Sequence, residues 1–188
     1  MEEKKETVGR ALHRGELPSG FREILPEALS VRIFDAVGRE GMLVTAETED
    51  GMPNPMTATW GGLGVLFGEP VAFCFIRPSR YTHTLIKNTR CLSLSFFGDA
   101  GKTALKVCGS MSGRDGDKTS AAGLSPFRLP EGGFSYLTAR LSIAATVICE
   151  APLDIMRISE SERHRYYQNG DVHTVFVSRV DAVYLREG

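Results

Sequence analysis

Short stretches in which apolar and polar residues alternate recur along most of this chain. Leu92, Leu94 and Phe96 alternate with two serines, and residues 141–149 place Leu, Ile, Ala, Val and Cys at every second position. Alternation with a period of two is typical of half-buried β-strands, whereas buried parallel strands have continuous apolar runs. The pattern therefore favours an antiparallel sheet, with a half-buried strand at residues 92–96.

Proline and turn signals place the other strands. Residues 41–48 also alternate, and the turn sequence Glu49-Asp50-Gly51 predicts a hairpin that continues into residues 52–60. Pro53 and Pro55 have no backbone N–H group to donate, so the second strand of this hairpin should lie at a sheet edge. Residues 71–76 predict a short buried strand, and residues 172–185 predict a last, long one.

Helical candidates are few and short, at residues 81–88, 102–107 and 159–167. They do not separate regularly spaced strands, which argues against a doubly wound α/β sheet. The predicted fold class is mainly β or α+β: an antiparallel barrel, closed or partly closed, with a few peripheral helices. Residues 1–22 are polar and predict an N-terminal arm, and residues 23–188 predict a single domain.

The charge balance and the N-terminal sequence argue against several classes of function. A formal net charge of -1 over 188 residues gives no field that would attract nucleic acid or an anionic membrane. The chain shows no secretory signal and no apolar run of about 18 residues, the length of a membrane span, so we expect a cytoplasmic protein. Cys74, Cys91, Cys108 and Cys149 are widely spaced without neighbouring histidines, which predicts reduced, buried thiols and no metal site.

Two loops that contain glycine, hydroxyl or arginine residues flank the apolar run of residues 70–76. The first reads Asn-Pro-Met-Thr-Ala-Thr-Trp-Gly-Gly at residues 54–62, and the second reads Arg-Pro-Ser-Arg-Tyr-Thr at residues 77–82. Backbone N–H groups beside glycine can approach a flat ring, while hydroxyls, a guanidinium group and a helix start can bind a phosphate. Together the loops predict a site for flavin mononucleotide (FMN). Its candidate residues are Thr57, Ala58, Thr59, Trp60 and Gly61 for the ring, and Arg77, Ser79, Arg80, Tyr81 and Thr82 in the phosphate loop.

Each loop alone also has an ordinary structural interpretation. Ser79 can cap the helix predicted at residues 81–88 while Arg80 is solvated, and Trp60 can be a core residue before a glycine turn. A third polar loop, residues 109–118, ends at Lys118, which is either a charge for the phosphate or an ordinary surface lysine. His173 opens the last strand, where it faces a ligand or fills a surface position.

In sequence order these blocks resemble the flavin reductase-like family with the FMN-binding split-barrel fold, a family that includes flavoredoxin. The resemblance covers about residues 35–187 and rests on Met-Thr-Ala-Thr-Trp-Gly (56–61), Arg-Pro-Ser-Arg-Tyr-Thr-His (77–83), Cys-Gly-Ser-Met-Ser-Gly-Arg-Asp-Gly-Asp-Lys (108–118) and His-Thr-Val-Phe-Val (173–177). It implies an antiparallel split β-barrel and a homodimer with the flavin near the subunit interface. It also implies that residues 57–61 line the isoalloxazine ring, that Ser79, Arg80 and Thr82 hold the phosphate, and that Ser112 and Lys118 complete the phosphate site.

The chain departs from the family pattern around His173. The family often has histidine directly after Gly-Asp and a glycine a few residues later, whereas here Val172 follows Asp171 and Ser178 stands at the glycine position. This departure argues against a nicotinamide-side role for His173, which is still the candidate for that side of the site. We expect no essential catalytic acid or base.

Two classes of function are consistent with these residues. In the first, NADH or NADPH passes hydride to flavin N5, which makes the protein an NAD(P)H:flavin oxidoreductase. In the second, the protein is an FMN-binding electron carrier that exchanges electrons with protein partners, an alternative left open by the absence of a Gly-x-Gly-x-x-Gly fingerprint. A flavin-binding module without redox turnover is a third alternative.

Overall fold

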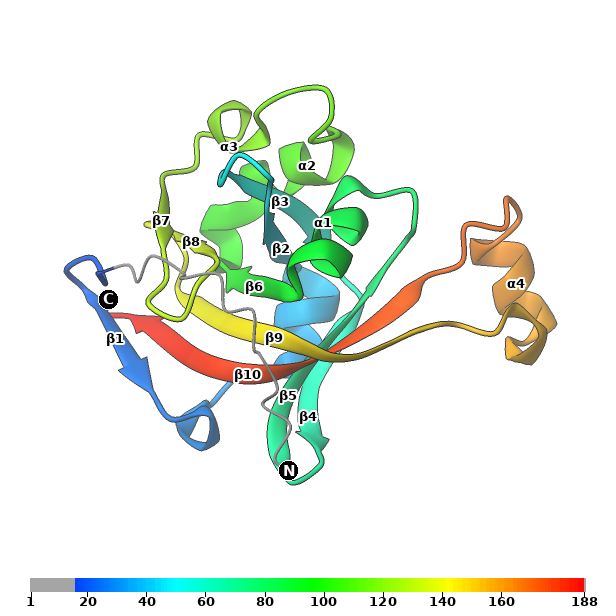
Figure 1. Cartoon of the computed structure of the whole chain (residues 1–188), viewed down its shortest axis with the longest axis horizontal. Coiled ribbons are helices and arrows are strands. Elements are labelled where there is room, and N and C mark those ends of the chain that lie inside the picture. Colours follow the sequence, from blue (N-terminus) through cyan, green and yellow to red (C-terminus); the bar gives the residue numbers. More distant parts are fainter. Residues whose placement is uncertain (1–15, 188) are drawn as a thin grey trace, which may run out of the picture.

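An eight-stranded antiparallel sheet forms the body of the computed structural model, which describes residues 16–187. Its strands follow the order β3-β2-β6-β9-β10-β5-β4, and β1 pairs with β10 outside this path. The sheet curls without closing, because β3 and β4 at its two ends do not pair (Figure 1). This confirms the antiparallel split β-barrel. The strands are β1 (Phe21–Ile24), β2 (Met42–Glu47), β3 (Pro53–Ala58), β4 (Gly61–Leu66), β5 (Glu69–Ile76), β6 (Cys91–Phe96), β9 (Leu141–Pro152) and β10 (Thr174–Arg186), with a separate hairpin of β7 (Pro126–Arg128) and β8 (Phe134–Tyr136).

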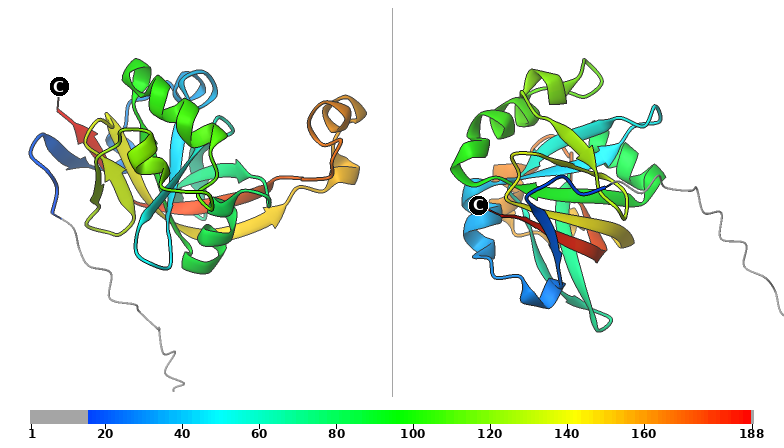
Figure 2. Two further views of the ribbon diagram at one scale, coloured as in Figure 1. Left: turned by 90° about the horizontal axis from the view of Figure 1, so that it is seen from above. Right: turned by 90° about the vertical axis from the view of Figure 1, so that its left-hand side faces the viewer.

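The helices are peripheral, as the sequence predicts. Figure 1 shows α1, α2 and α3 beside β2 and β3, whereas α4 stands away from the barrel at the end of a long excursion of β9 and β10. The left-hand view in Figure 2 shows the same separation of α4. The helices are α1 (Tyr81–Thr89), α2 (Lys102–Ser110), α3 (Lys118–Ala121) and α4 (Glu160–Tyr166), with a π-helix η2 (Phe34–Glu40) and short 3-10 helices η1 (Pro26–Ala28), η3 (Gly98–Gly101) and η4 (Ile155–Arg157).

The hairpin of β2 and β3 forms where the sequence predicts it. Gly51 has a φ of 77°, a left-handed conformation that glycine adopts without a steric penalty, and its N–H group donates to the carbonyl of Thr48. Pro53 and Pro55 lie on β3, which is the end strand of the sheet. The outer edge of β3 therefore tolerates the two missing donors.

Strand β6 is buried on both faces, so the prediction of a half-buried strand was wrong. Ser93 and Ser95 are both 0% exposed. The Ser93 hydroxyl donates to the carbonyl of Phe134 on β8, a strand that the sequence pattern did not predict. Alternation in the sequence shows only which side chains are polar and not whether they are buried. Here the hairpin of β7 and β8, which is distant in the sequence, covers polar side chains of β6.

The core lies inside the curled sheet and extends outward under the helices. Met42, Val44 and Ala46 on one face of β2 belong to the main apolar cluster of the barrel. Leu43 points to the other face and belongs to a second cluster that includes Leu105 of α2. Because β2 is covered on both faces, α2 and its neighbouring loops are held firmly against the barrel.

Several predictions concern the ends of the chain and its thiols. Phe21 and Arg22 of the predicted arm form the start of β1, and residues 1–15 lie outside the described residues. No helix within residues 16–187 is long and apolar enough to cross a membrane. Cys74 and Cys108 are buried, but Cys149 is exposed, because this part of β9 runs out toward α4.

Candidate functional site

The start of α1 holds the loop that the sequence assigns to a phosphate. Arg80 is the N-cap residue of α1. The backbone N–H group and the hydroxyl of Ser79 both donate to the carboxylate of Asp171, at 3.3 and 2.6 Å. Ser79 thus already binds an anionic group in this structure, and that group is a side chain of the segment after α4.

A buried lysine lies close to Arg80. Lys118 begins α3 and is 5% exposed. Burial is the main cause that lowers the pKa of Lys118 to about 8; Cys108 opposes this shift and Arg80 adds to it. Within the described part of the chain no carboxylate pairs with either cation. Two positive charges without a counter-ion form a site suited to an anion.

The last turn of α2 and the loop that follows it lie against the start of α1. Arg80 donates to the carbonyl of Gly109 at 3.1 Å. A Cβ atom at Gly113 would lie 1.8 Å from the Asn54 side-chain oxygen, so only glycine allows the loop to approach β3 this closely. The amide of Asn54 in turn donates to the hydroxyl of Thr82 at 2.7 Å. Three segments that are far apart in the sequence therefore meet at the start of α1.

The remaining phosphate-loop candidates have separate contacts. Ser112 is half-buried in the loop between α2 and α3, and its hydroxyl accepts a hydrogen bond from the Arg114 N–H group at 3.2 Å. The Tyr81 ring lies under the guanidinium group of Arg114, 4.8 Å from its carbon. Ser112 can still donate its hydroxyl proton to a ligand.

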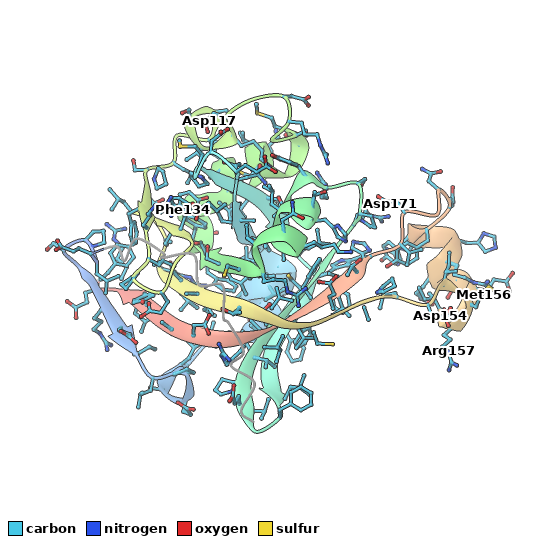
Figure 3. All side chains as sticks on the ribbon, viewed as in Figure 1. Asp117, Phe134, Asp154, Met156, Arg157 and Asp171 are labelled. Carbon is cyan, nitrogen blue, oxygen red and sulfur yellow. The ribbon has the colours of Figure 1, made fainter. Side chains whose placement is uncertain are left out.

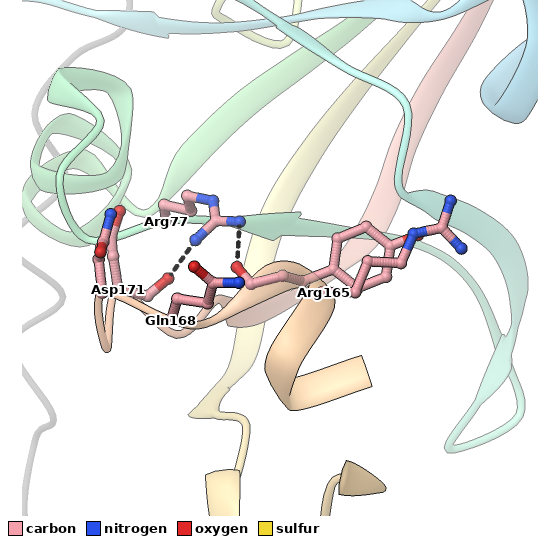
Figure 4. A pocket seen from close by; sticks show the side chains of 6 residues that line it. Arg77, Arg165, Gln168 and Asp171 are labelled. Carbon is pink, nitrogen blue, oxygen red and sulfur yellow. Dashed lines mark hydrogen bonds between the residues drawn. The ribbon is translucent and has the colours of Figure 1, made fainter. Parts of the chain in front are cut away.

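Arg77 holds the segment that follows α4. Its two terminal nitrogens donate to the carbonyl oxygens of Asp171 and Tyr166, at 2.6 and 2.9 Å (Figure 4). Because both nitrogens are engaged, Arg77 is a positioning residue in this structure. It fixes the base of the excursion that carries Asp171 to Ser79.

The ring-binding candidates span the end of β3 and the start of β4. The Thr57 hydroxyl donates to the carbonyl of Leu105 at 2.5 Å, and the Ala58 side chain is in the core. Thr59 is exposed and Trp60 is half-buried. Gly61 belongs to β4 and not to a loop: a Cβ atom there would lie 2.3 Å from the carbonyl oxygen of Phe73 on β5. The glycine is therefore required by strand pairing.

An aromatic cluster lies beside Trp60. The Trp60 ring centroid is 4.5 Å from that of His173 and 5.1 Å from that of Tyr166. His173 is buried, and its Nδ1 atom forms a hydrogen bond with the Tyr167 hydroxyl at 2.9 Å. Burial, with the nearby Arg77 charge, lowers the pKa of His173 to about 4 although Asp171 opposes the shift. His173 is therefore neutral at pH 7, which suits contact with an aromatic ring better than proton transfer.

The structure brings Arg80 close to Lys118, with Ser79 and Thr82 next to Arg80 in the chain, and Trp60 and His173 lie together in the aromatic cluster. Sequence reasoning missed Asp171 and Tyr166. Asp171 was noticed only as part of the turn Asn169-Gly170-Asp171, which is typical of a connection and carries no information on its distant partner.

A comparison with protein families shows to which family the chain belongs. The family model described as "Flavin reductase like domain" matches residues 34–188. The chain belongs to the flavin reductase-like family. The match includes all the candidate site residues named above. A search of curated proteins with this sequence gave no match.

Several proteins of known structure share the fold of this flavin reductase-like protein. An FMN-binding domain of a flavin reductase-like enzyme from Shewanella baltica superposes with a TM-score of 0.64 at 14% identity, over 92% of this chain and 78% of that one. An FMN-binding protein from Thermus thermophilus gives a TM-score of 0.64 at 24% identity, over 89% and 83% of the two chains. Flavoredoxin of Desulfovibrio vulgaris gives 0.63 at 18% identity, over 87% and 78%.

Proposed function

We propose that this flavin reductase-like protein binds FMN and acts as an oxidoreductase with a nicotinamide electron donor. The observation that carries the proposal is the buried Lys118 beside Arg80 without a carboxylate partner in the described chain. Burying the Lys118 charge next to the half-buried Arg80 is unfavourable unless an anion neutralises them, and a phosphate dianion does so. The proteins of known structure named above, which include FMN-binding proteins and flavoredoxin, support the choice of FMN.

The residues of this site fit the two halves of FMN. Arg80, Lys118 and the N–H groups at the start of α1 would hold the phosphate, with hydroxyl donors from Thr82 and Ser112. The backbone of residues 57–61 would line the isoalloxazine ring. The aromatic side chains of Trp60, Tyr166 and His173 would limit the access of water to one end of the ring.

The flavin supplies the redox chemistry when it is bound: it takes a hydride, two electrons and one proton, from NADH or NADPH, and passes two electrons to an acceptor. The protein's own residues bind and orient the two partners. Since His173 is neutral and hydrogen-bonded to Tyr167, it is a packing partner for the nicotinamide side and not a general base.

Anaerobic reduction of the FMN-loaded protein tests the proposal. NADH or NADPH should bleach the flavin absorbance band in a stopped-flow experiment, and His173→Ala should change the rate only modestly. If dithionite bleaches the flavin but neither nucleotide does, the protein is an electron carrier. If purified protein titrated with FMN shows no binding, the whole proposal is wrong.

The electron-carrier alternative has one supporting observation. The chain has no Gly-x-Gly-x-x-Gly fingerprint, so a nicotinamide donor would have to bind on the open side of the flavin. A carrier would be reduced photochemically and reoxidised by a partner protein. Reoxidation by a protein acceptor together with inert NADH and NADPH would establish this second function.

We also propose a homodimer. Phe34, Val65 and Phe67 are 91%, 75% and 83% exposed, an unusual exposure for side chains of this size and a common feature of association surfaces. Light scattering of the FMN-loaded protein should give twice the mass of the 20.6 kDa chain. A single-chain mass with FMN fully bound would contradict the dimer.

FMN binding should weaken as the pH rises through about 8. The pKa of Lys118 in the free protein is about 8, and a bound phosphate favours the protonated amine, so binding takes up a proton above this pH. The affinity should be highest below pH 8 and fall about tenfold between about pH 7 and pH 9, the loss of one charge-assisted contact. Fluorescence titration with FMN measures this dependence.

Lys118→Met is the variant that isolates the lysine. It should bind FMN more weakly at neutral pH and lose the pH dependence, while riboflavin, which lacks the phosphate, should show none with either protein. A dependence that persists in Lys118→Met would assign the titration to another group.

Asp171→Asn should strengthen FMN binding by about threefold to tenfold. The Asp171 carboxylate accepts both Ser79 donors, so it competes with the phosphate and repels it. Asp154 is the matched control, because it lies on the far part of the excursion, whereas Asp171 lies at its base (Figure 3). Weaker FMN binding by Asp171→Asn, with Asp154→Asn unchanged, would mean that Asp171 orders Ser79 for the ligand.

A further inference from the structure

A polar hollow of about 400 Å³ lies at the base of the excursion that carries α4. It is lined by Arg77, Arg165, Tyr166, Gln168, Asn169 and Asp171 (Figure 4). Its volume is in the range of sites for small ligands. Two of the other lining side chains have structural contacts: the Gln168 amide donates to the carbonyl of His164 at 2.8 Å, and Asp171 turns its carboxylate to Ser79. Arg165 and Asn169 have no role in the FMN site described above.

The cations of this hollow lack carboxylate partners. Arg77 donates to two backbone carbonyls, and Arg165 lies over the Tyr166 ring at 5.1 Å from its centroid. Neither of them forms an ion pair with a described residue. Carbonyl oxygens and aromatic rings do not neutralise a guanidinium charge. An anion entering the hollow meets these two guanidinium groups and one carboxylate, that of Asp171, whose oxygens accept hydrogen bonds from the N–H group and the hydroxyl of Ser79.

In a second hollow on the same molecule, by contrast, the arginines do have carboxylate partners. That hollow, of about 430 Å³, contains Arg32, Arg39 and Arg140. Each of these three is paired: Arg32 and Arg39 with Asp35, and Arg140 with Glu40. The hollow near α4 is therefore the one of the two in which the cations remain available for a ligand.

The hollow adjoins the ring-binding part of the FMN site through one side chain. Tyr166 lines the hollow, and its ring is 5.1 Å from Trp60, which belongs to the candidate ring-binding segment. A donor whose nicotinamide lies on the flavin would extend past Trp60 and Tyr166. Its adenosine end would then reach the side chains of Arg165, Gln168 and Asn169, which offer hydrogen-bond donors to a phosphate and to a ribose or adenine.

We propose that this hollow binds the adenosine 2′-phosphate of NADPH, so that the protein uses NADPH in preference to NADH. This inference names the donor for the proposed function and rests on it. Arg165 is the residue that distinguishes the two nucleotides, because its guanidinium group is committed only to a ring contact. Arg77 contributes charge from the floor of the hollow while it keeps its carbonyl contacts.

Binding to the protein without FMN tests the hollow directly. The chain has one tryptophan, Trp60, which contacts Tyr166 at the wall of the hollow, so its fluorescence reports on occupancy. We expect 2′,5′-ADP to bind at least about tenfold more tightly than 5′-AMP, the value of one charge-assisted contact. Inorganic phosphate should compete with 2′,5′-ADP only weakly, because it lacks the adenosine contacts. Equal affinities for 2′,5′-ADP and 5′-AMP, or phosphate that competes as well as 2′,5′-ADP, would overturn the inference.

Arg165→Gln should bring the affinities for 2′,5′-ADP and 5′-AMP to within about twofold of each other. Arg157→Gln is the matched control: Arg157 is exposed on η4 of the same excursion and is paired with Asp154 at 3.2 Å. It should keep the wild-type preference. A preference that survives Arg165→Gln would exclude Arg165 as the determinant.

FMN titration of the same proteins separates this inference from the proposed function. Tight FMN binding with no preference for 2′,5′-ADP contradicts the hollow alone. A clear 2′,5′-ADP preference with no FMN binding contradicts the flavin function and leaves a nucleotide site. With FMN loaded, NADPH should bleach the flavin at lower concentrations than NADH, and Arg165→Gln should remove that difference.

Discussion

Arg80→Ala should weaken FMN binding by about tenfold or more and leave riboflavin binding almost unchanged. Arg80 is one of the two cations at the start of α1, and a charge-assisted contact is worth about 1.5 to 3 kcal/mol. Riboflavin has the same ring without the phosphate, so it reports on the rest of the site. Quenching of flavin fluorescence on binding measures both affinities.

Two comparisons make this result specific. Arg22→Ala removes an exposed arginine on β1, which lies away from α1 in Figure 1, and should bind FMN like the wild type. Equal losses of FMN and riboflavin with Arg80→Ala would mean that the substitution disturbs the loop before α1, whose Arg80 contact with Gly109 is also lost. The phosphate assignment would then be wrong.

Gly61→Ala should lower the free energy of unfolding by about 3 kcal/mol or more. The added Cβ atom would lie 2.3 Å from the carbonyl oxygen of Phe73, and the φ of Gly61 is 155°, which side chains other than glycine rarely adopt. Both the clash and the backbone conformation oppose the substitution, and backbone strain of this kind alone costs about 1 to 3 kcal/mol. Urea unfolding of the protein without flavin measures the change.

Gly64→Ala is the control on the same strand. The nearest atom to a Cβ at Gly64 is Phe73 Cε1 at 4.0 Å, an ordinary contact, so this variant should be close to the wild type in stability. If Gly61→Ala unfolds like Gly64→Ala but loses FMN, the glycine serves the flavin ring and not the pairing of β4 with β5.

Local signals were enough to predict much of the fold. The hairpin of β2 and β3, the edge position of β3 and the start of α1 depend on prolines, a turn and a helix start, which act within a few residues. The sequence did not reveal β4, because three of its six residues are glycine and carry no polarity pattern. It also misjudged β6, whose Ser93 contacts β8, 41 residues further on.

The candidate site also has parts that local sequence signals indicate and parts that they do not. The loops at residues 77–82 and 109–118 contain Arg80 and Lys118, which lie near each other in the structure. Arg77 and Ser79 contact Asp171 from 94 and 92 residues away. No local pattern marks such a pair, because the base of the α4 excursion reaches the start of α1 only through the topology of β9 and β10.

The two ends of the open sheet differ in their resistance to aggregation. Unpaired strand edges can add a strand from another molecule, and prolines or charges on an edge prevent this. β3 carries two prolines, whereas β4 has the sequence Gly-Gly-Leu-Gly-Val-Leu with neither proline nor charge. Intermolecular strand addition is therefore favoured at β4, and substitutions that introduce lysine on its outer edge should improve solubility where those on β3 do not.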